Sequence, residues 1–206
     1  MTAGTTRRAS GVARLAALGA VAVLLAACAS LPPPAPSAAE ALSSVDAPFS
    51  LGGRISARRG DAGVAGNFAW THDPQHDAID LATPLGQTLA QLSGNAQEVS
   101  VRLSDGRVES ASSWSALTQK AFGVTIPVDG LAWWIRALPR PQARYGVERD
   151  ASGRVSVLRQ DGWDVVYAYA DDASRQPARA TLRYPGADPI EVRVVVDRRE
   201  TTGSAR

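Results

Sequence analysis

The chain of 206 residues contains a single cysteine, Cys28, and only two histidines. One thiol excludes an intramolecular disulfide, and a lone cysteine cannot hold a structural zinc ion. The sequence also lacks a glycine-rich phosphate loop and a Gly-x-Ser-x-Gly nucleophile motif. Because no set of residues supplies an acid, a base and a nucleophile together, we expect no enzymatic activity and no cofactor.

The two histidines could in principle belong to a metal site. His72 and His76 are four residues apart, but Pro74 between them argues against the helix that would align their side chains. A metal site that includes the nearby Asp73 and Asp77 is one interpretation. A polar turn between two strands is the interpretation that the proline favours, and we predict no metal site.

Long apolar runs are also missing. The run from Leu15 to Ala27 holds only Leu, Ala, Val and Gly, and its 13 residues fall short of the ~20 that a membrane-spanning helix needs. Arg7, Arg8 and Arg14 precede this run. A basic segment followed by a short apolar run is typical of a bacterial secretory signal.

The signal ends on Leu25-Ala26-Ala27-Cys28, which resembles the lipobox of bacterial lipoproteins. This resemblance implies that residues 1–27 are a cleaved signal peptide and that Cys28 carries the lipid anchor. An ordinary cleaved signal is the alternative. The residue after the cysteine is Ala29 rather than an aspartate that would retain the protein in the inner membrane. We therefore expect a lipid-anchored protein of the outer membrane that faces the periplasm.

The charge of the chain depends on this leader. The whole sequence has 22 basic and 20 acidic residues, a formal net charge of +2. Removal of the leader's three arginines leaves 19 basic residues against 20 acidic ones, a net charge of −1. A nearly neutral mature chain gives no electrostatic reason to expect nucleic-acid binding.

The mature chain divides into a tether, one domain and a tail. Residues 28–48 follow the lipid site and are rich in Pro and Ala without an apolar period, which is typical of a semi-rigid tether. Residues 49–198 are long enough for one domain with a sizeable core. We expect residues 199–206 to be a flexible tail.

Alternation of apolar and polar residues dominates the domain and predicts strands. It begins at Phe49 and recurs in the segments around 64–70, 99–103, 163–169 and 190–196. In the last of these, Ile190, Val192, Val194 and Val196 share one face. One apolar face on each strand predicts an antiparallel sheet covered on a single side.

Helical spacing appears only in the middle of the domain. Ser112 or Ser113 can cap a short helix that runs through Phe122. A second apolar stripe follows and is ended by Pro139 and Pro141; its residues are Leu131, Trp134, Ile135 and Leu138. We predict a mainly β fold of ten or eleven strands, a strongly curved sheet with helices plugging its concave face.

Two features suggest a function. Trp70, Trp134, Trp163 and Tyr167 occupy inward positions, where they either fill a core or line an apolar cavity. The segment Pro84-Leu85-Gly86 joins two predicted strands, and a leucine at the tip of such a turn is exposed. Leu85 either folds back over the sheet edge or serves as an apolar finger toward a membrane or a lipid.

Five short motifs follow one another along residues 49–197. They are Gly53-Arg54-Ile55, Phe68-x-Trp70, Pro84-Leu85-Gly86, Ile126 to Pro139 (IPV followed by L--WI--LP), and Gly162 to Tyr167 (GW-VVY). This ordered set resembles the outer-membrane lipoprotein receptor family LolB. The chain departs from the family pattern at Ala137, where the family tends to have Gly, and at Arg198, where a tryptophan is expected.

The resemblance implies an incomplete antiparallel β-barrel of about 11 strands whose helices cap a hydrophobic cavity. It implies a monomer that accepts the acyl chains of lipoproteins from the periplasmic carrier LolA and places them in the inner leaflet of the outer membrane without ATP. Pro84, Leu85 and Gly86 would then form the membrane-insertion loop. The expected cavity residues are Phe68, Trp70, Leu131, Trp134, Ile135, Trp163, Val165 and Tyr167.

Two other functions remain open from the sequence. One is an outer-membrane-anchored binding module for a different apolar ligand, which would share the cavity but would not need Leu85. The other is an envelope lipoprotein with a filled core that acts as a structural scaffold and takes up no ligand.

Overall fold

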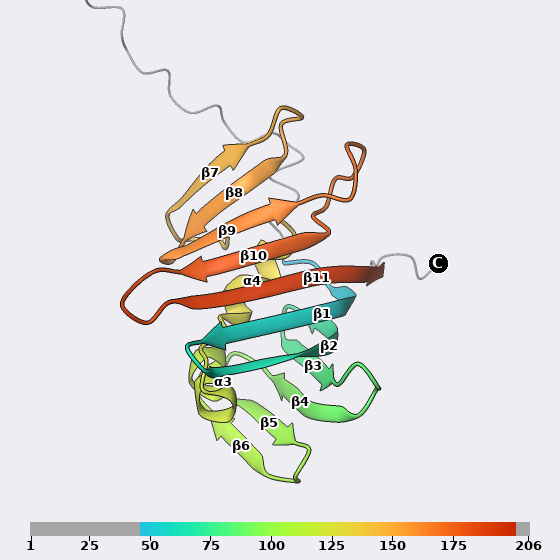
Figure 1. The fold of residues 1–206 in the computed structure, drawn as a ribbon, viewed down its shortest axis with the longest axis vertical. Helices are drawn as coiled ribbons and strands as arrows, with labels where there is room; N and C mark the ends of the chain where they lie inside the picture. The colour runs from blue at the N-terminus through green and yellow to red at the C-terminus, as the bar shows by residue number, and fades with distance from the viewer. Residues whose placement is uncertain (1–45, 201–206) are drawn as a thin grey trace, which may run out of the picture. The chain divides into compact units, whose positions relative to one another are not determined.

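The computed structural model describes residues 46–200, which form one antiparallel sheet and two helices (Figure 1). The predicted signal peptide, the lipidation site Cys28 and most of the predicted tether lie outside the described residues. Of the helices in the described range, none has the length and apolar character that a membrane-spanning segment requires.

The sheet has 11 strands, at the upper end of the predicted number. They are β1 (Phe49–Arg59), β2 (Ala62–Asp73), β3 (His76–Ala82), β4 (Thr88–Gly94), β5 (Val99–Leu103), β6 (Val108–Ala111), β7 (Tyr145–Arg149), β8 (Val155–Gln160), β9 (Trp163–Ala168), β10 (Arg179–Tyr184) and β11 (Ile190–Glu200). The last strand ends at Glu200, two residues beyond the predicted domain boundary.

Two meanders build this sheet, and pairing of the first strand with the last joins them. The strand order is β6-β5-β4-β3-β2-β1-β11-β10-β9-β8-β7, and the pairs are antiparallel. The two ends of the order, β6 and β7, do not pair with each other within residues 46–200, so the barrel stays open. The predicted half-open antiparallel barrel is confirmed.

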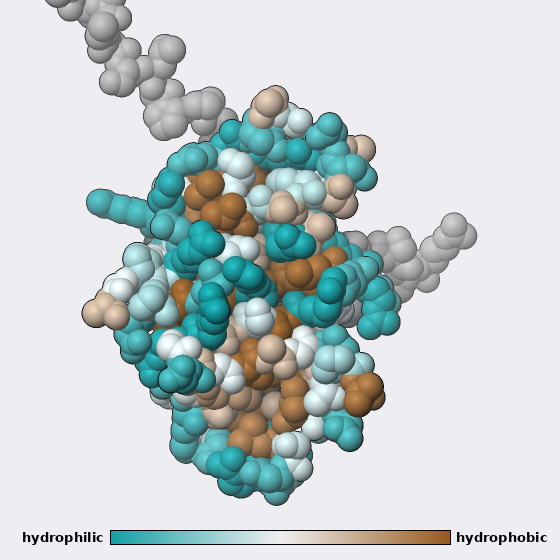
Figure 2. Space-filling model, in the orientation of Figure 1, coloured by the Kyte–Doolittle hydropathy of each residue, from teal (hydrophilic) through white to brown (hydrophobic). Residues whose placement is uncertain are grey.

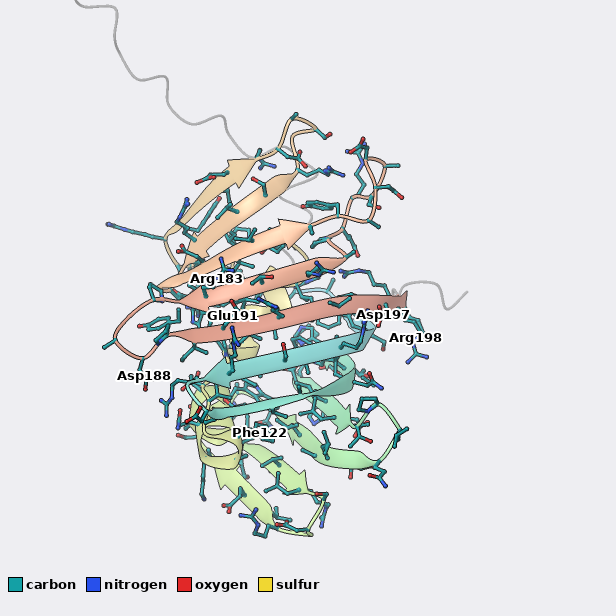
Figure 3. All side chains as sticks on the ribbon, viewed as in Figure 1. Phe122, Arg183, Asp188, Glu191, Asp197 and Arg198 are labelled. Atoms are coloured by element: carbon teal, nitrogen blue, oxygen red, sulfur yellow. The ribbon has the colours of Figure 1, made fainter. Side chains whose placement is uncertain are left out.

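The two faces of the sheet differ as the alternation predicts. Inward residues of the central strands form a continuous buried core, whereas the outer face carries ion pairs. On that outer face Glu191 of β11 accepts from Arg183 of β10 at 3.2 Å and lies 2.9 Å from Arg193 (Figure 3). Charged side chains on one face and apolar side chains on the other place the core on the concave side.

The α3 helix (Trp114–Phe122) begins and ends as the sequence predicts. The Ser113 hydroxyl accepts a hydrogen bond from the backbone N–H of Ala116, and Gly123 ends the helix in the left-handed conformation at φ 72°. The helix contacts β6, β5 and β2. It therefore covers the concave face near one edge of the sheet.

The α4 helix (Val128–Trp134) is shorter than predicted, because it ends before the two prolines are reached. The N–H of Leu138 bonds to the carbonyl of Trp133 at 3.3 Å, and the N–H of Ala137 bonds to that of Trp134 at 2.9 Å. These two bonds and the φ of 59° at Ala137 define a Schellman motif. The left-handed residue stops the helix, and Pro139 only follows in the exit segment.

Candidate functional site

An apolar cavity lies between the helices and the concave face of β1–β4 and β11. The sheet contributes Ile55, Phe68, Trp70, Ile79, Leu81, Leu92 and Val194, and the helical segment contributes Thr118, Phe122, Ile126, Val128 and Leu131. Every one of these side chains is apolar except that of Thr118. A cavity with this lining can hold hydrocarbon but offers almost no polar contact to a ligand.

The single polar side chain of the lining is already engaged in the connection between α3 and α4. The Thr118 hydroxyl donates to the carbonyl of Trp114 at 3.0 Å and accepts from the N–H of Ile126 at 2.8 Å. These bonds fix the start of the α4 segment against α3. The hydroxyl therefore stabilises the backbone that surrounds the cavity, and its hydrogen bonds leave it unable to bind a ligand.

The cavity is small in this structure, about 30 Å³ in volume. That is room for about two water molecules, at roughly 10–15 Å³ each. It is too little for an acyl chain, so the lining must rearrange before such a chain can enter. Partly exposed hydrophobic side chains border this region, and Figure 2 shows hydrophobic surface over the part of the molecule that holds α3 and β3–β6.

The eight residues predicted to line an acyl-chain cavity are all buried, but only some of them meet at this cavity. Phe68, Trp70 and Leu131 line it. The other five lie in the continuous core outside its lining; they are Trp134, Ile135, Trp163, Val165 and Tyr167. Their role toward an acyl chain stays a prediction.

Trp134 and Trp163 illustrate how that second part of the core is filled. The Trp134 indole N–H donates to the side-chain carbonyl of Gln160 at 2.8 Å, and its ring lies 6.4 Å from the ring of Trp163. Tyr167 lies in the same core, and within the described residues its buried hydroxyl has no hydrogen-bond partner. Burial raises the pKa of this hydroxyl, so it stays protonated.

The loop between β3 and β4 displays Leu85 with 90% of its surface exposed. The N–H of Gly86 bonds to the carbonyl of Thr83 at 2.9 Å, and Thr83 and Gln87 are joined by a backbone bond of 2.8 Å. Gly86 adopts φ 85°, the left-handed conformation that closes a three-residue hairpin loop. Leu85 does not fold back over the sheet, and a hydrogen-bonded turn holds it away from the core.

The predicted membrane-insertion loop and the cavity belong to the same hairpin. Ile79 and Leu81 of β3 and Leu92 of β4 line the cavity, and Pro84-Leu85-Gly86 closes the hairpin that these strands form. A hydrophobic projection stands at this end of the hairpin in Figure 2. An exposed apolar tip and an apolar cavity are thus joined by two short strands.

A buried polar cluster lies at the start of β1 and was not predicted from the sequence. His72 is 5% exposed, and its ring nitrogens lie 2.8 Å from Asp77 and 2.9 Å from Asp46. The polar turn predicted for this segment is present between β2 and β3, but His72 precedes it and faces the core. His72 lies on the same face of β2 as Phe68 and Trp70, because the three are alternate residues of one strand. This alternation could have predicted that His72 faces the core.

The cluster also holds a cation between aromatic rings. The Arg136 guanidinium lies 5.5 Å from the ring of Phe49 and 5.0 Å from that of Trp133, and 3.5 Å from Asp46. Burial lowers the pKa of Arg136, and the Asp46 charge opposes this shift. Residues 46–200 contain no group of His, Cys, Asp and Glu side chains arranged to hold a metal ion. Through Asp46 the cluster connects the segment before β1 to His72 of β2 and to Arg136 after α4.

Comparison with known proteins identifies the family. A family model described as outer membrane lipoprotein LolB matches residues 47–198. The outer-membrane lipoprotein LolB of Azoarcus sp. (strain BH72) is 38% identical over 190 residues, which cover 90% of this chain and 95% of that protein. The outer-membrane lipoprotein LolB of Thiobacillus denitrificans is 35% identical over 185 residues, which cover 89% and 96% of the two chains.

Among solved structures, a LolA superfamily protein from Nitrosomonas europaea aligns with a TM-score of 0.48 at 10% sequence identity. The alignment covers 82% of this chain and 96% of that one. The family model spans almost the whole described sheet and both helices, and the two relatives match along most of their length. The chain therefore belongs to the LolB family of outer-membrane lipoproteins.

Proposed function

We propose that the protein is an outer-membrane lipoprotein receptor that accepts the acyl chains of other lipoproteins from the periplasmic carrier LolA. It then inserts those chains into the inner leaflet of the outer membrane. The observation that carries this proposal is the exposed Leu85 at the tip of the hairpin whose strands line an apolar cavity. The relatives are named outer-membrane lipoproteins, which supports the same location for this chain.

In this proposal the N-terminal segment determines where the protein is located in the cell. Residues 1–27 direct export, Cys28 carries the lipid anchor, and the segment up to residue 48 is the tether. The domain then faces the periplasm as a monomer. All of these residues but the last three, 46–48, precede the described part of the chain, and the proposal for the export signal and the anchor rests on the lipobox motif.

The energetics of the cargo favour transfer between sheltered sites. A lipoprotein with three acyl chains exposes on the order of 45 methylenes in water, each costing ~0.8 kcal/mol. Such a cargo must pass directly from one apolar site to another. The bilayer is the most favourable of these sites, so the transfer runs downhill and needs no ATP.

The cavity opens during this cycle. At about 30 Å³ it holds no acyl chain, whereas its lining is hydrocarbon on all sides. Cargo entry therefore separates the α3–α4 segment from the sheet. The exposed apolar surface created by this opening is covered by the acyl chains themselves, which lowers its cost.

A transfer assay tests the proposal. Carrier loaded with a labelled lipoprotein is mixed with the mature chain, first without and then with liposomes. We expect the label to move from the carrier to the receptor and then into the liposomes. In Leu85→Glu the label reaches the receptor but enters liposomes about tenfold more slowly or worse, because a carboxylate resists entry into the bilayer.

Val108→Glu is the matched control, since Val108 on β6 is also an exposed aliphatic residue, 53% exposed. It carries the same charge change outside the loop, and we expect wild-type transfer. Label that never leaves the carrier in the wild type would overturn the receptor proposal. Equal slowing by both glutamates would remove the special role of the loop.

The small volume of the cavity favours a second candidate, a structural envelope lipoprotein with a filled core. A scaffold takes up no apolar ligand. Incubation of the mature chain with a fluorescent fatty-acyl probe separates the two: saturable binding contradicts the scaffold. Binding of the probe without any acceptance of lipoprotein from the carrier would point instead to a binding module for another apolar ligand.

A further inference from the structure

A second, open groove of about 480 Å³ lies where β11 ends, beside the segment that connects β9 to β10. Its walls are residues 170, 174–178 and 196–199. Arg175, Arg198 and Arg199 all belong to it, and Arg198 is labelled at the end of β11 in Figure 3. This groove is separate from the apolar cavity and shares no lining residue with it.

The charge of the groove is positive. No carboxylate in the described range pairs with Arg175, Arg198 or Arg199. The one acid of the lining, Asp197, is held by Arg54 through bonds of 3.1 and 3.2 Å. Three arginines therefore belong to the lining of the groove, and its single carboxylate is already paired with an arginine of the neighbouring strand.

A β-bulge turns Arg199 toward the inside of the sheet. The register of β1 against β11 shifts between Gly52 and Gly53, so Arg199 lies opposite the buried Leu51. The guanidinium donates to the carbonyl of Pro177 at 2.5 Å and to that of Ile135 at 3.4 Å. Burial lowers the pKa of Arg199, and no acid compensates for this shift. A half-buried cation without an acid gains most from a bound anion.

The end of β11, which lines the groove, lies on the same side of the molecule as the Leu85 loop. In Figure 1 the end of β11, the β3–β4 loop and the beginning of β1 all lie on the right of the view. The described chain therefore enters β1 from the side on which Leu85 projects, and the proposed anchor Cys28 precedes this entry. A membrane that takes up Leu85 would therefore approach the molecule from the side on which β11 ends.

We propose that this groove binds the phosphate-bearing headgroup of an anionic phospholipid while Leu85 enters the bilayer. The inference rests on the proposed function, and it adds the lipid class that the membrane-facing side recognises. Burial of one leucine side chain improves partitioning only on the order of 30-fold, too little to hold a domain at the surface. Arginines near an anionic surface add about fivefold each, and an apolar anchor with a basic patch is an effective pair.

Vesicle binding tests the groove. The whole mature chain, residues 28–206 with Cys28→Ala so that no lipid tethers it, is sedimented with vesicles of phosphatidylcholine alone or mixed with phosphatidylglycerol. We expect wild-type binding to rise when phosphatidylglycerol is present. In Arg175→Gln/Arg198→Gln this rise falls by about fivefold for each arginine removed.

Arg102→Gln/Arg144→Gln is the matched control, because both arginines are exposed, lie outside the groove and change the net charge equally. We expect it to keep the gain from phosphatidylglycerol. Leu85→Glu should weaken binding to both kinds of vesicle, and the groove variant only the part that depends on phosphatidylglycerol.

Three outcomes overturn the proposal. They are a wild type that gains nothing from phosphatidylglycerol, equal losses in the groove and control variants, and a groove variant that keeps the full gain from phosphatidylglycerol. None of these touches the receptor function, which is measured by transfer of cargo into neutral vesicles. Failure of that transfer overturns the receptor function even where the groove binds anionic lipid.

Discussion

Ala137 occupies the left-handed position of the Schellman motif that ends α4, at φ 59°. A Cβ in this conformation approaches the following carbonyl, and the strain costs roughly 1–2 kcal/mol. Glycine lacks this strain but loses about 0.5–1 kcal/mol in backbone entropy. We therefore expect Ala137→Gly to raise the free energy of unfolding by about 0.5–1 kcal/mol, measured by urea denaturation.

Ala116→Gly is the control, and we expect it to change the free energy of unfolding in the opposite direction. Ala116 is an exposed residue inside α3, where the helical conformation suits alanine. There the same change should lower stability by about 1 kcal/mol. Destabilisation in both variants would contradict the strain at Ala137.

His72 makes the stability of the protein depend on pH. Burial lowers its pKa, but the hydrogen bonds to Asp77 and Asp46 outweigh burial and raise the pKa above the ordinary 6.5. A pKa raised by folding gives stability that is complete below pH 6.5 and is lost as pH rises through the folded value. The wild type should therefore lose stability as the pH rises above 6.5.

The thermal unfolding midpoint at several pH values measures this effect. His72→Gln removes the titrating group, and we expect the slope above pH 6.5 to flatten in that variant. His76→Gln is the control, because His76 is exposed at the start of β3 and this variant should keep the wild-type slope. A slope that persists in His72→Gln would assign the pH dependence to another group.

At the scale of elements, one glutamine fastens the segment after α4 to the sheet. The buried Gln160 of β8 accepts from the indole of Trp134 at 2.8 Å and from the N–H of Arg140 at 2.7 Å, and donates to the carbonyl of Arg140 at 2.8 Å. We expect Gln160→Met to cost about 3 kcal/mol of unfolding free energy, since several buried polar groups lose their partner. Gln91→Met on the exposed face of β4 should change stability by less than ~0.5 kcal/mol.

Elements with local signals are the ones that the sequence predicts well. Ser113 and Gly123 bracket α3, and the alternation from Ile190 to Val196 fixes the inward face of β11. The early end of α4 was not predictable, because alanine carries no sign that it adopts the left-handed conformation. The inward position of Arg199 was missed for a related reason. A β-bulge exchanges the inward and outward faces of the residues that follow it, and the residue types in the strand do not reveal it.

The candidate site divides in the same way. Exposure of Leu85 follows from a Pro-x-Gly turn between two strands, which is local information. The position of the cavity does not follow from local information, because it depends on where the inward side chains of distant strands leave space between them. Phe68 and Val165 look alike in the alternation, yet Phe68 borders the cavity and Val165 does not.

At the scale of the whole molecule, the proposed function requires a closed core and an acyl-filled core on the same sheet. Two meanders joined by β1 and β11 leave the barrel open, and the helical segment between β6 and β7 covers the concave face. We therefore expect an acyl chain to enter by movement of this helical cover, without rearrangement of the strands. The cost of that movement is set by how well the cover packs when the cavity is empty.

Val194 of β11 offers a way to shift this competition. It is buried and borders the cavity of about 30 Å³. One added methylene that fills this space should stabilise the protein by about 0.7 kcal/mol, at ~24 cal/mol per Å³ of cavity removed. In Val194→Ile we therefore expect a higher free energy of unfolding and, because only the closed form gains, about threefold weaker binding of an acyl probe.

Val165→Ile separates cavity filling from the addition of a methylene to any buried valine. Val165 is fully buried in the core outside the cavity, where an extra group forces neighbours apart and costs typically 1–3 kcal/mol. We therefore expect Val165→Ile to lower the free energy of unfolding in urea. In Val194→Ile, by contrast, the free energy of unfolding should rise while affinity for the probe falls. If Val194→Ile gained stability with unchanged affinity, acyl chains would enter without displacing the cover, and the closed cavity would not be the state that cargo must open.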